Sequence, residues 1–279
     1  MADPRAPWGN RTAVMGVLNL TPDSFSDGGR LTSVAQAVGA AGRMLAQGAD
    51  LLDLGAQSTR PGAEEVGPKR ELARLLPALT AIRSAHPAVL LSVDTFHSAV
   101  AEAALAAGAD WINDVSGGRR DPAMLPLAAS AGCPLVLMHS RGDSRSMNSL
   151  ASYGDVVAEV RAGLLAATEM ALAAGVRPLQ LIWDPGLGFA KDTDHNLDLL
   201  RGLSSVAAEG FPLLVGPSRK RFIGAVLSEP RPRARLWGTA AVCSQAIAQG
   251  ARILRVHDVG PIVQVARMAD ALRPPQPGG

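Results

Sequence analysis

Short apolar runs alternate with longer amphipathic stretches along most of the chain. About eight of the runs suit buried parallel strands, at residues 14–20, 50–55, 89–94, 110–115, 134–139, 180–184, 212–216 and 252–257. The segments between them are rich in alanine and amphipathic, which indicates helices. Strands that alternate with helices at this spacing predict a parallel sheet, and about eight units in one domain favour a closed (β/α)8 TIM barrel.

The junctions between helices and strands follow one pattern. Five helical stretches end on a glycine that is followed almost at once by the next apolar run, at Gly48, Gly108, Gly132, Gly175 and Gly250. Glycine suits the left-handed position after a helix, so each junction closes one βα unit. The alternative is an open, doubly wound sheet. It is weakened because no GxGxxG pattern follows the first strand.

Length and composition favour a single domain. The 279 residues are 47% hydrophobic and 19% charged, and no Ser/Gly linker divides them. We expect a short extension at 1–12, a catalytic barrel at 13–273 and a disordered tail at 274–279, where proline and glycine are frequent. The apolar runs are too short to span a membrane, and the first residues lack a secretory signal, which predicts a cytoplasmic protein.

Charge and cysteine usage exclude other classes of function. The net charge is only +2, and the basic residues form no stripe with interleaved aromatic residues, so nucleic-acid binding has little support. Cys133 and Cys243 lie in apolar segments without CxxC spacing, which predicts buried thiols. His86, His97 and His195 lack the spacing of metal ligands, and we predict no zinc site.

Polar residues stand where the predicted strands end. In a barrel the active site lies at the carboxyl ends of the strands, and buried polar groups are costly unless they are satisfied. We therefore expect these side chains to share one ligand. The strand ends carry Asn19, Asp53, Asp94, Asn113, His139, Asp184, a GPSRK turn at 216–220, Arg255 and His257.

Four of these positions suit a flat nitrogen heterocycle. The carboxylates of Asp94 and Asp184, the amide of Asn113 and the ammonium of Lys220 would match the donors and acceptors on its edge. Each also has a simpler interpretation. Asp94 is a possible helix cap, Asn113 or its neighbour Asp114 another, the Pro-Gly after Asp184 a tight turn, and SRKR a solvated helix start.

The remaining strand ends suit an anion and a hard cation. Asn19 either initiates a turn or offers an oxygen to Mg2+, which bridges substrate phosphates, and the small residues after it suit a mobile lid. Arg255 and His257 stand two residues apart on one face of a strand, where they would grip phosphate. A core histidine is the alternative for His257.

Several motifs, in order from about residue 14 to 265, together resemble dihydropteroate synthase. They are GVLNLTPDSFSDGG, QSTRPGAEEV, SVDTFHSAVAEAAL, INDVSGG, LMHSRG, DPGLGFAKDTDHN, LVGPSRKRFIG and RVHDV. The resemblance implies a (β/α)8 barrel, generally a homodimer. It would condense 7,8-dihydropterin-6-ylmethyl diphosphate with 4-aminobenzoate in folate synthesis, releasing diphosphate, and sulfonamides would compete with the aminobenzoate.

The resemblance also implies roles for individual residues. The pterin would be bound by Asp94, Asn113, Met138, Asp184, Phe189 and Lys220. The diphosphate would be bound by Asn19, Thr59, Arg255 and His257, with Mg2+ on Asn19. The aminobenzoate site would be formed by Phe25, Thr59, Arg60, Pro61 and Ser218, mostly on two loops that close. The catalytic set would be Asp94, Lys220, Arg255 and His257, acting in an SN1-like substitution without a strong general base.

One departure from the family pattern leaves alternatives open. Gln57 stands where relatives usually have glutamate before STRPG, which puts the support of that loop in doubt. A pterin-dependent methyltransferase domain would share the barrel and the pterin-binding Asp and Asn, yet it would need neither RVHDV nor the STRPG loop. A non-catalytic pterin-binding paralogue is the third interpretation.

Overall fold

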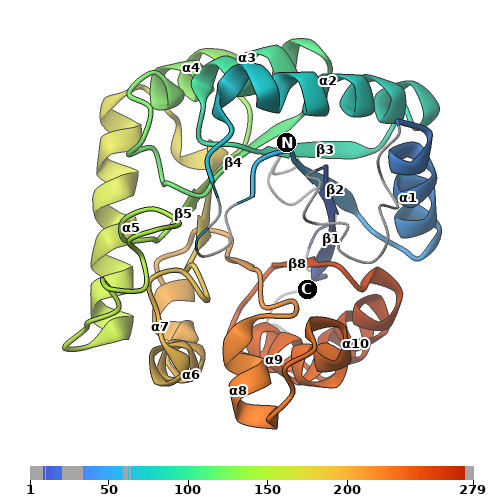
Figure 1. Cartoon of the computed structure of the whole chain (residues 1–279). Helices are drawn as coiled ribbons and strands as arrows, with labels where there is room; N and C mark the ends of the chain where they lie inside the picture. The colour runs from blue at the N-terminus through green and yellow to red at the C-terminus, as the bar shows by residue number, and fades with distance from the viewer. Residues whose placement is uncertain (1–8, 10, 21–33, 59–61, 63, 274–279) are drawn as a thin grey trace.

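The fold is a parallel barrel, seen along its axis in Figure 1 with helices around the central strands. The computed structural model describes residues 9, 11–20, 34–58, 62 and 64–273. Eight parallel strands follow the order β6-β5-β4-β3-β2-β1-β8-β7. A parallel bridge between Trp183 and Leu213 joins β6 to β7 and closes the ring. The predicted TIM barrel is confirmed, and the open doubly wound sheet is excluded.

All eight predicted strands are present. They are β1 (Ala13–Asn19), β2 (Leu51–Gly55), β3 (Leu90–Asp94), β4 (Trp111–Asp114), β5 (Leu135–Met138), β6 (Leu181–Asp184), β7 (Leu214–Val215) and β8 (Ile253–Val256). The α-helices are α1 (Val34–Ala46), α2 (Gly67–Ala85), α3 (Ser98–Ala106), α4 (Met124–Ala131), α5 (Val156–Ala173), α6 (Thr193–Arg201), α7 (Leu203–Ala207), α8 (Arg221–Leu227), α9 (Leu236–Ala248) and α10 (Val259–Ala271). Two 3-10 turns, Pro178–Gln180 and Pro232–Arg235, precede β6 and α9.

The interior of the barrel changes from apolar to polar along the strands. One buried cluster fills the interior near the amino ends of the strands. It consists of Ala13, Met15, Leu51, Trp111, Val136, Ile182, Leu214 and Ile253. Side chains two residues apart on a strand share a face. The next inward positions after Leu51, Trp111, Ile182 and Ile253 are therefore Asp53, Asn113, Asp184 and Arg255. Alternation thus places polar groups above an aliphatic floor, at the carboxyl ends of the strands.

The predicted helix-to-strand junctions have the expected backbone. Gly48, Gly108, Gly132, Gly175 and Gly250 all have positive φ, between 67° and 102°. Because a Cβ disfavours this region, glycine allows each helix to end and the next strand to begin within a few residues. These short junctions keep the strands in register around the ring.

Two further expectations concern buried thiols and membrane spans. Cys133 and Cys243 are free and buried, as predicted. Within residues 34–58 and 64–273 no helix combines the length and the apolar character that a membrane span requires. The segments predicted as the extension and the disordered tail lie almost wholly outside the described residues.

Candidate active site

A cavity opens at the mouth of the barrel, above the aliphatic floor. It encloses about 340 Å3, part of it open to solvent. Its lining brings together all six residues predicted to bind pterin and adds Arg255. The lining residues are Asp94, Asn113, Val115, Met138, Asp184, Leu187, Phe189, Gly216, Lys220 and Arg255. The sequence interpretation of a single site shared by distant strand ends therefore agrees with the geometry of this cavity.

Arg255 joins three strands on one side of the cavity. Its Nε lies 2.6 Å from Asp53 Oδ2, and its Nη2 lies 2.6 Å from Asp94 Oδ2. Asn113 Nδ2 donates to the same Asp53 oxygen at 3.1 Å. Asp53 is completely buried, and it holds both Arg255 and Asn113 in place. The sequence identifies Asp53 only as a strand-end residue, because no local pattern shows which cation from another strand faces it.

Burial and ion pairing oppose each other in this network. Burial raises the pKa of Asp94, the cation of Arg255 opposes this shift, and the neighbouring Asp53 adds to it, so that the pKa is raised overall to about 7. Burial lowers the pKa of Arg255, but the two carboxylates outweigh burial and raise it overall. Arg255 is therefore a permanent cation, and its ion pair favours the charged form of Asp94.

The opposite wall carries Asp184, Lys220 and Phe189. Burial raises the pKa of Asp184, and the amide of Gly186 donates to its Oδ1 at 2.7 Å. Burial lowers the pKa of Lys220 to about 8, although Asp184 opposes the shift. The Lys220 ammonium lies 4.3 Å from the centre of the Phe189 ring, over its face. This wall therefore offers a cation, a carboxylate and an aromatic surface to one ligand.

The simpler interpretations of these residues divide between neighbours. Asp94 is not a helix cap, because α3 begins at Ser98, whose amide donates to Asp121 at 2.7 Å. Asp114, by contrast, accepts from the amides of Ser116 and Gly118, both at 2.8 Å. Asp114 therefore caps the loop after β4, which leaves Asn113 directed into the cavity.

The GPSRK turn is not a solvated basic segment. Arg219 has a left-handed φ of 61°, and its guanidinium contacts both oxygens of Asp258 at 3.0 and 2.6 Å. Arg235 Nη1 donates to the Arg219 carbonyl at 3.0 Å. These contacts fix the turn so that the next residue, Lys220, faces the cavity.

Three predicted residues gather at one edge of the mouth, where β1, β7 and β8 end. Asn19 Nδ2 lies 3.5 Å from His257 Nε2, and His257 Nδ1 lies 3.0 Å from the Ser218 hydroxyl. The backbone amide of His257 also donates to that hydroxyl at 3.2 Å. His257 is therefore oriented by Ser218 and faces Asn19, and this arrangement differs from that of a core histidine.

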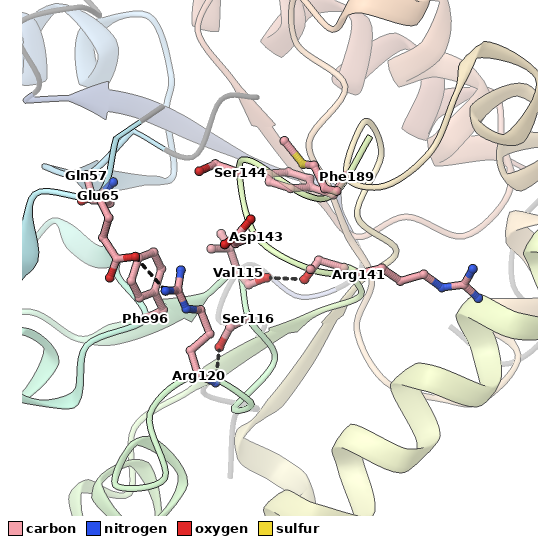
Figure 2. A pocket seen from close by; sticks show the side chains of 13 residues that line it. Gln57, Glu65, Phe96, Val115, Ser116, Arg120, Arg141, Asp143, Ser144 and Phe189 are labelled. Carbon is pink, nitrogen blue, oxygen red and sulfur yellow. Dashed lines mark hydrogen bonds and ion pairs between the residues drawn. The ribbon is translucent and has the colours of Figure 1, made fainter. Parts of the chain in front are cut away.

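A second cavity of about 470 Å3 adjoins the first, and Val115 and Phe189 line both. Figure 2 shows Glu65, Phe96 and Arg120 on its left side. Arg120 pairs with Glu65 at 2.7 Å and lies 4.2 Å from the centre of the Phe96 ring. The Arg141 head group points away from this cavity in Figure 2 and pairs with Glu159 at 2.6 Å.

Gln57 is hydrogen-bonded to the backbone at Ser58, Glu64 and Val66, which answers the doubt about the support that this residue provides. Gln57 Nε2 donates to the carbonyls of Ser58 and Glu64 at 3.0 and 3.2 Å. Its Oε1 accepts from the amide of Val66 at 2.8 Å. The side-chain amide of Gln57 therefore connects Ser58 with Glu64 and Val66. Phe25, Thr59, Arg60 and Pro61, predicted for the aminobenzoate loops, lie outside the described residues.

Comparison with known proteins assigns the chain to a family. Residues 15–257 match the model of the pterin binding enzyme family. A dihydropteroate synthase from Synechocystis sp. is 50% identical over 265 residues, which cover 95% of this chain and 91% of the relative. This chain belongs to the dihydropteroate synthase family. Members of this family are transferases of folate biosynthesis, and the activity of this chain is accordingly dihydropteroate synthesis.

Further relatives agree with this assignment. The dihydropteroate synthase of Mycobacterium leprae is 47% identical over 264 residues, which cover 92% of both chains. The solved dihydropteroate synthase of Xanthomonas albilineans with 4-aminobenzoic acid has a TM-score of 0.88 at 43% identity and covers 95% of both chains. A structure of the Xanthomonas albilineans enzyme with 7,8-dihydropteroate has a TM-score of 0.84 at 40% identity, with 95% coverage of both chains.

Proposed function

We propose that this dihydropteroate synthase binds the pterin diphosphate in the first cavity and transfers its pterin-methyl group to 4-aminobenzoate. The observation that carries the proposal is the convergence of Asp94, Asn113, Asp184 and Lys220 on one cavity. Two carboxylates, an amide and an ammonium match the N–H groups, ring nitrogens and carbonyl of a pterin. Phe189 and Met138 supply apolar surface for the flat ring.

We propose an SN1-like mechanism. The carbon–oxygen bond between the pterin methylene and the diphosphate breaks, and both electrons leave with the diphosphate. The resulting cation is stabilised by the anionic Asp94, which Arg255 holds at 2.6 Å. The amine nitrogen of 4-aminobenzoate then forms the new bond and loses a proton. The amine is already nucleophilic, so we assign no general base.

The diphosphate is proposed to lie between the cavity and the Asn19–His257 edge. His257 would donate a hydrogen bond to it, and Arg255 would add positive charge beside it. Among the residues described, no cluster of three or more His, Cys, Asp or Glu could hold a metal ion. A single amide such as Asn19 fits Mg2+ only when diphosphate and water supply the other ligands, and the bound ion would neutralise charge on the leaving group.

The aminobenzoate is proposed to bind beside Ser218, under the two loops that carry Phe25 and Thr59–Pro61. Ser218 is suited to this position because its hydroxyl already contacts His257 at the edge of the cavity. Closure of the loops would exclude water, which also reacts with the cation. Thr59 would in addition contact the diphosphate.

The proposal is tested by a turnover assay with the pterin diphosphate, 4-aminobenzoate and Mg2+, in which dihydropteroate and diphosphate are both measured. We expect equal amounts of the two products. Pterin binding without release of diphosphate, where a known synthase turns over, would support the non-catalytic paralogue. Omission of Mg2+ should suppress turnover, and addition of Mg2+ should restore it.

The SN1-like step has its own test. Pterin diphosphate is labelled with 18O at the oxygen that bridges the methylene carbon and the first phosphorus. It is then incubated with enzyme and Mg2+ without 4-aminobenzoate. If the bond breaks reversibly before the amine attacks, the label moves to non-bridging positions in recovered substrate. Retention of all label at the bridge, in an enzyme that turns over, would favour concerted displacement.

We also propose that the enzyme is a homodimer and cytoplasmic. Exposed apolar side chains on α8 and α9 support the dimer, since Trp237 is 77% exposed, Val226 57% and Leu227 50%. The test is the molar mass in solution of the wild type and of Trp237→Glu. A monomeric wild type at micromolar concentration would refute the dimer.

A further inference from the structure

The loop after β6, residues 185–191, follows Asp184 and carries Phe189, and both of these residues line the first cavity. Lys191, at the end of this loop, binds back to it. Only 8% of its surface is exposed. Its ammonium lies 3.1 Å from the carbonyl oxygens of Gly186 and Phe189 and 3.1 Å from His139 Nδ1. The three N–H groups of the ammonium thus have three acceptors, two within the loop and one beyond the end of β5.

The same loop is pressed against the end of β5. The amide of His139 donates to the carbonyl of Asp184 at 2.9 Å. A Cβ on Gly186, which has a φ of 69°, would lie 1.9 Å from the His139 carbonyl oxygen, so only glycine fits there. The loop therefore has one close approach to the backbone of His139, and Lys191 adds a contact with the His139 side chain.

His139 is suited to accept rather than donate at Nδ1. Burial and, to a smaller extent, the charge of Lys191 together lower the pKa of His139 to about 2, so the ring is neutral at physiological pH. Burial lowers the pKa of Lys191 to about 7, although the charge of the nearby Asp184 opposes this shift. A methionine would fill this space without the cost of burying a cation. The nitrogen of Lys191 is therefore explained by its three hydrogen bonds rather than by packing.

A second side chain holds the loop from the helix that follows it. Gly188 donates its amide to Asn196 Oδ1 at 2.7 Å, and Asn196 Nδ2 donates to the Lys191 carbonyl at 3.2 Å. The backbone between these contacts is strained, since Ala190 has a φ of 48°. A strained loop needs such contacts to keep one conformation.

We propose that Lys191 is a positioning residue for the pterin: by fixing the carbonyls of Gly186 and Phe189, it sets the Phe189 ring against Lys220 and the loop against Asp184. Lys191 does not line the cavity and is not a catalytic residue. The identity of the ligand rests on the proposed function. The conformation of the loop does not.

The test replaces Lys191 with methionine, which has a similar length and no charge. We expect the dissociation constant for the pterin diphosphate with Mg2+ to rise about tenfold or more, the value of one or two charge-assisted hydrogen bonds. The KM for 4-aminobenzoate should change less than about twofold. Amide hydrogen exchange should accelerate in 185–190 but not in the strands β1–β4. The control is Lys69→Met, at an exposed position on α2.

Lys191→Gln, which keeps two amide donors, gives a second measurement. We expect a smaller loss of pterin affinity than in Lys191→Met, and faster exchange in the same segment. If Lys191→Met does not fold, this variant decides. Uniform acceleration across the barrel, or wild-type exchange in 185–190 together with wild-type affinity, would overturn the inference. Because amide hydrogen exchange is measured without substrates, it tests the inference even if the turnover assay shows no activity.

Discussion

The guanidinium of Arg255 is held by Asp53, with 2.6 Å between Nε and Oδ2, so the last strand of the barrel is tied to the second. Asp53 Oδ2 also accepts from Asn113 at 3.1 Å. One buried carboxylate therefore orients a cation and an amide that both line the first cavity. Its contribution to the reaction is indirect, through the groups that it positions.

Asp53→Asn should lower kcat/KM for the pterin diphosphate about tenfold or more, because Arg255 then keeps a charged partner only in Asp94. The free energy of unfolding should fall by about 1–3 kcal/mol, since a charge-assisted hydrogen bond is weakened in the interior. Steady-state kinetics and urea unfolding measure the two effects. Asp198→Asn is the control, because its ion pair with Arg201 is exposed. Unchanged kinetics would show that Arg255 needs no second carboxylate.

Lys220 should give the reaction a pH dependence. The pKa of its ammonium is lowered to about 8 by burial, so the amine loses its charge as pH rises through this value. The cationic form is the one suited to a pterin ring nitrogen or carbonyl. We therefore expect kcat/KM for the pterin diphosphate to decline above about pH 8, which the pH profile of the free enzyme measures.

Substitution of Lys220 distinguishes this group from others that titrate nearby. Lys220→Ala should reduce turnover by more than about a hundredfold, with the fold intact by circular dichroism. Lys220→Arg keeps its charge over the whole range, so any residual activity should lose the decline above pH 8. A decline that persists in Lys220→Arg would assign it to another residue.

Gln57 should govern the binding of 4-aminobenzoate. Gln57→Glu removes two donors and places a carboxylate beside the carbonyls of Ser58 and Glu64, which repel it. The KM for 4-aminobenzoate should rise about threefold to tenfold, while the affinity for the pterin diphosphate stays unchanged. Gln57→Leu, which also loses the bond from Val66, should show a larger rise. Equal KM values in all three proteins would exclude this support.

Alternation along strands explains how much of the site could be predicted. Asn113 follows Trp111 by two residues, and Asp184 follows Ile182 in the same way. Because side chains two residues apart share a face of a strand, Asn113 and Asp184 point into the barrel as Trp111 and Ile182 do, but nearer to the carboxyl ends of the strands. The fold and the residues that line the first cavity could be predicted from this local pattern together with the family resemblance.

Contacts between distant segments could not be read in this way. The pairing of Asp53 with Arg255 depends on which side chains of β2 and β8 meet inside the barrel, and no local pattern encodes it. Lys191 reads as an ordinary residue before a helix, yet the chain folds its ammonium back onto Gly186 and His139. In the sequence, Gln57 is the loss of a carboxylate. In the structure its amide both donates and accepts hydrogen bonds, whereas an ionised carboxylate only accepts them.

Glu71 should make the stability of the enzyme depend on pH. It is fully buried in α2, and burial raises its pKa to about 7, against 4.5 for an ordinary glutamate. The folded protein therefore binds a proton more tightly than the unfolded chain. Below about pH 4.5 both states are protonated, and Glu71 has no effect. Stability is then lost as pH rises from about 4.5 to 7, because only the folded state must bury the charge.

Glu71→Gln removes this ionisation while keeping the shape of the side chain. At pH 8 the variant should be more stable than the wild type, by up to about 3 kcal/mol from the difference in pKa. At pH 4.5 the two should be alike. Chemical unfolding at both pH values measures the difference, with Glu102→Gln at an exposed position of α3 as the control. A gain of equal size at both pH values would mean that packing, rather than ionisation, separates the variant from the wild type.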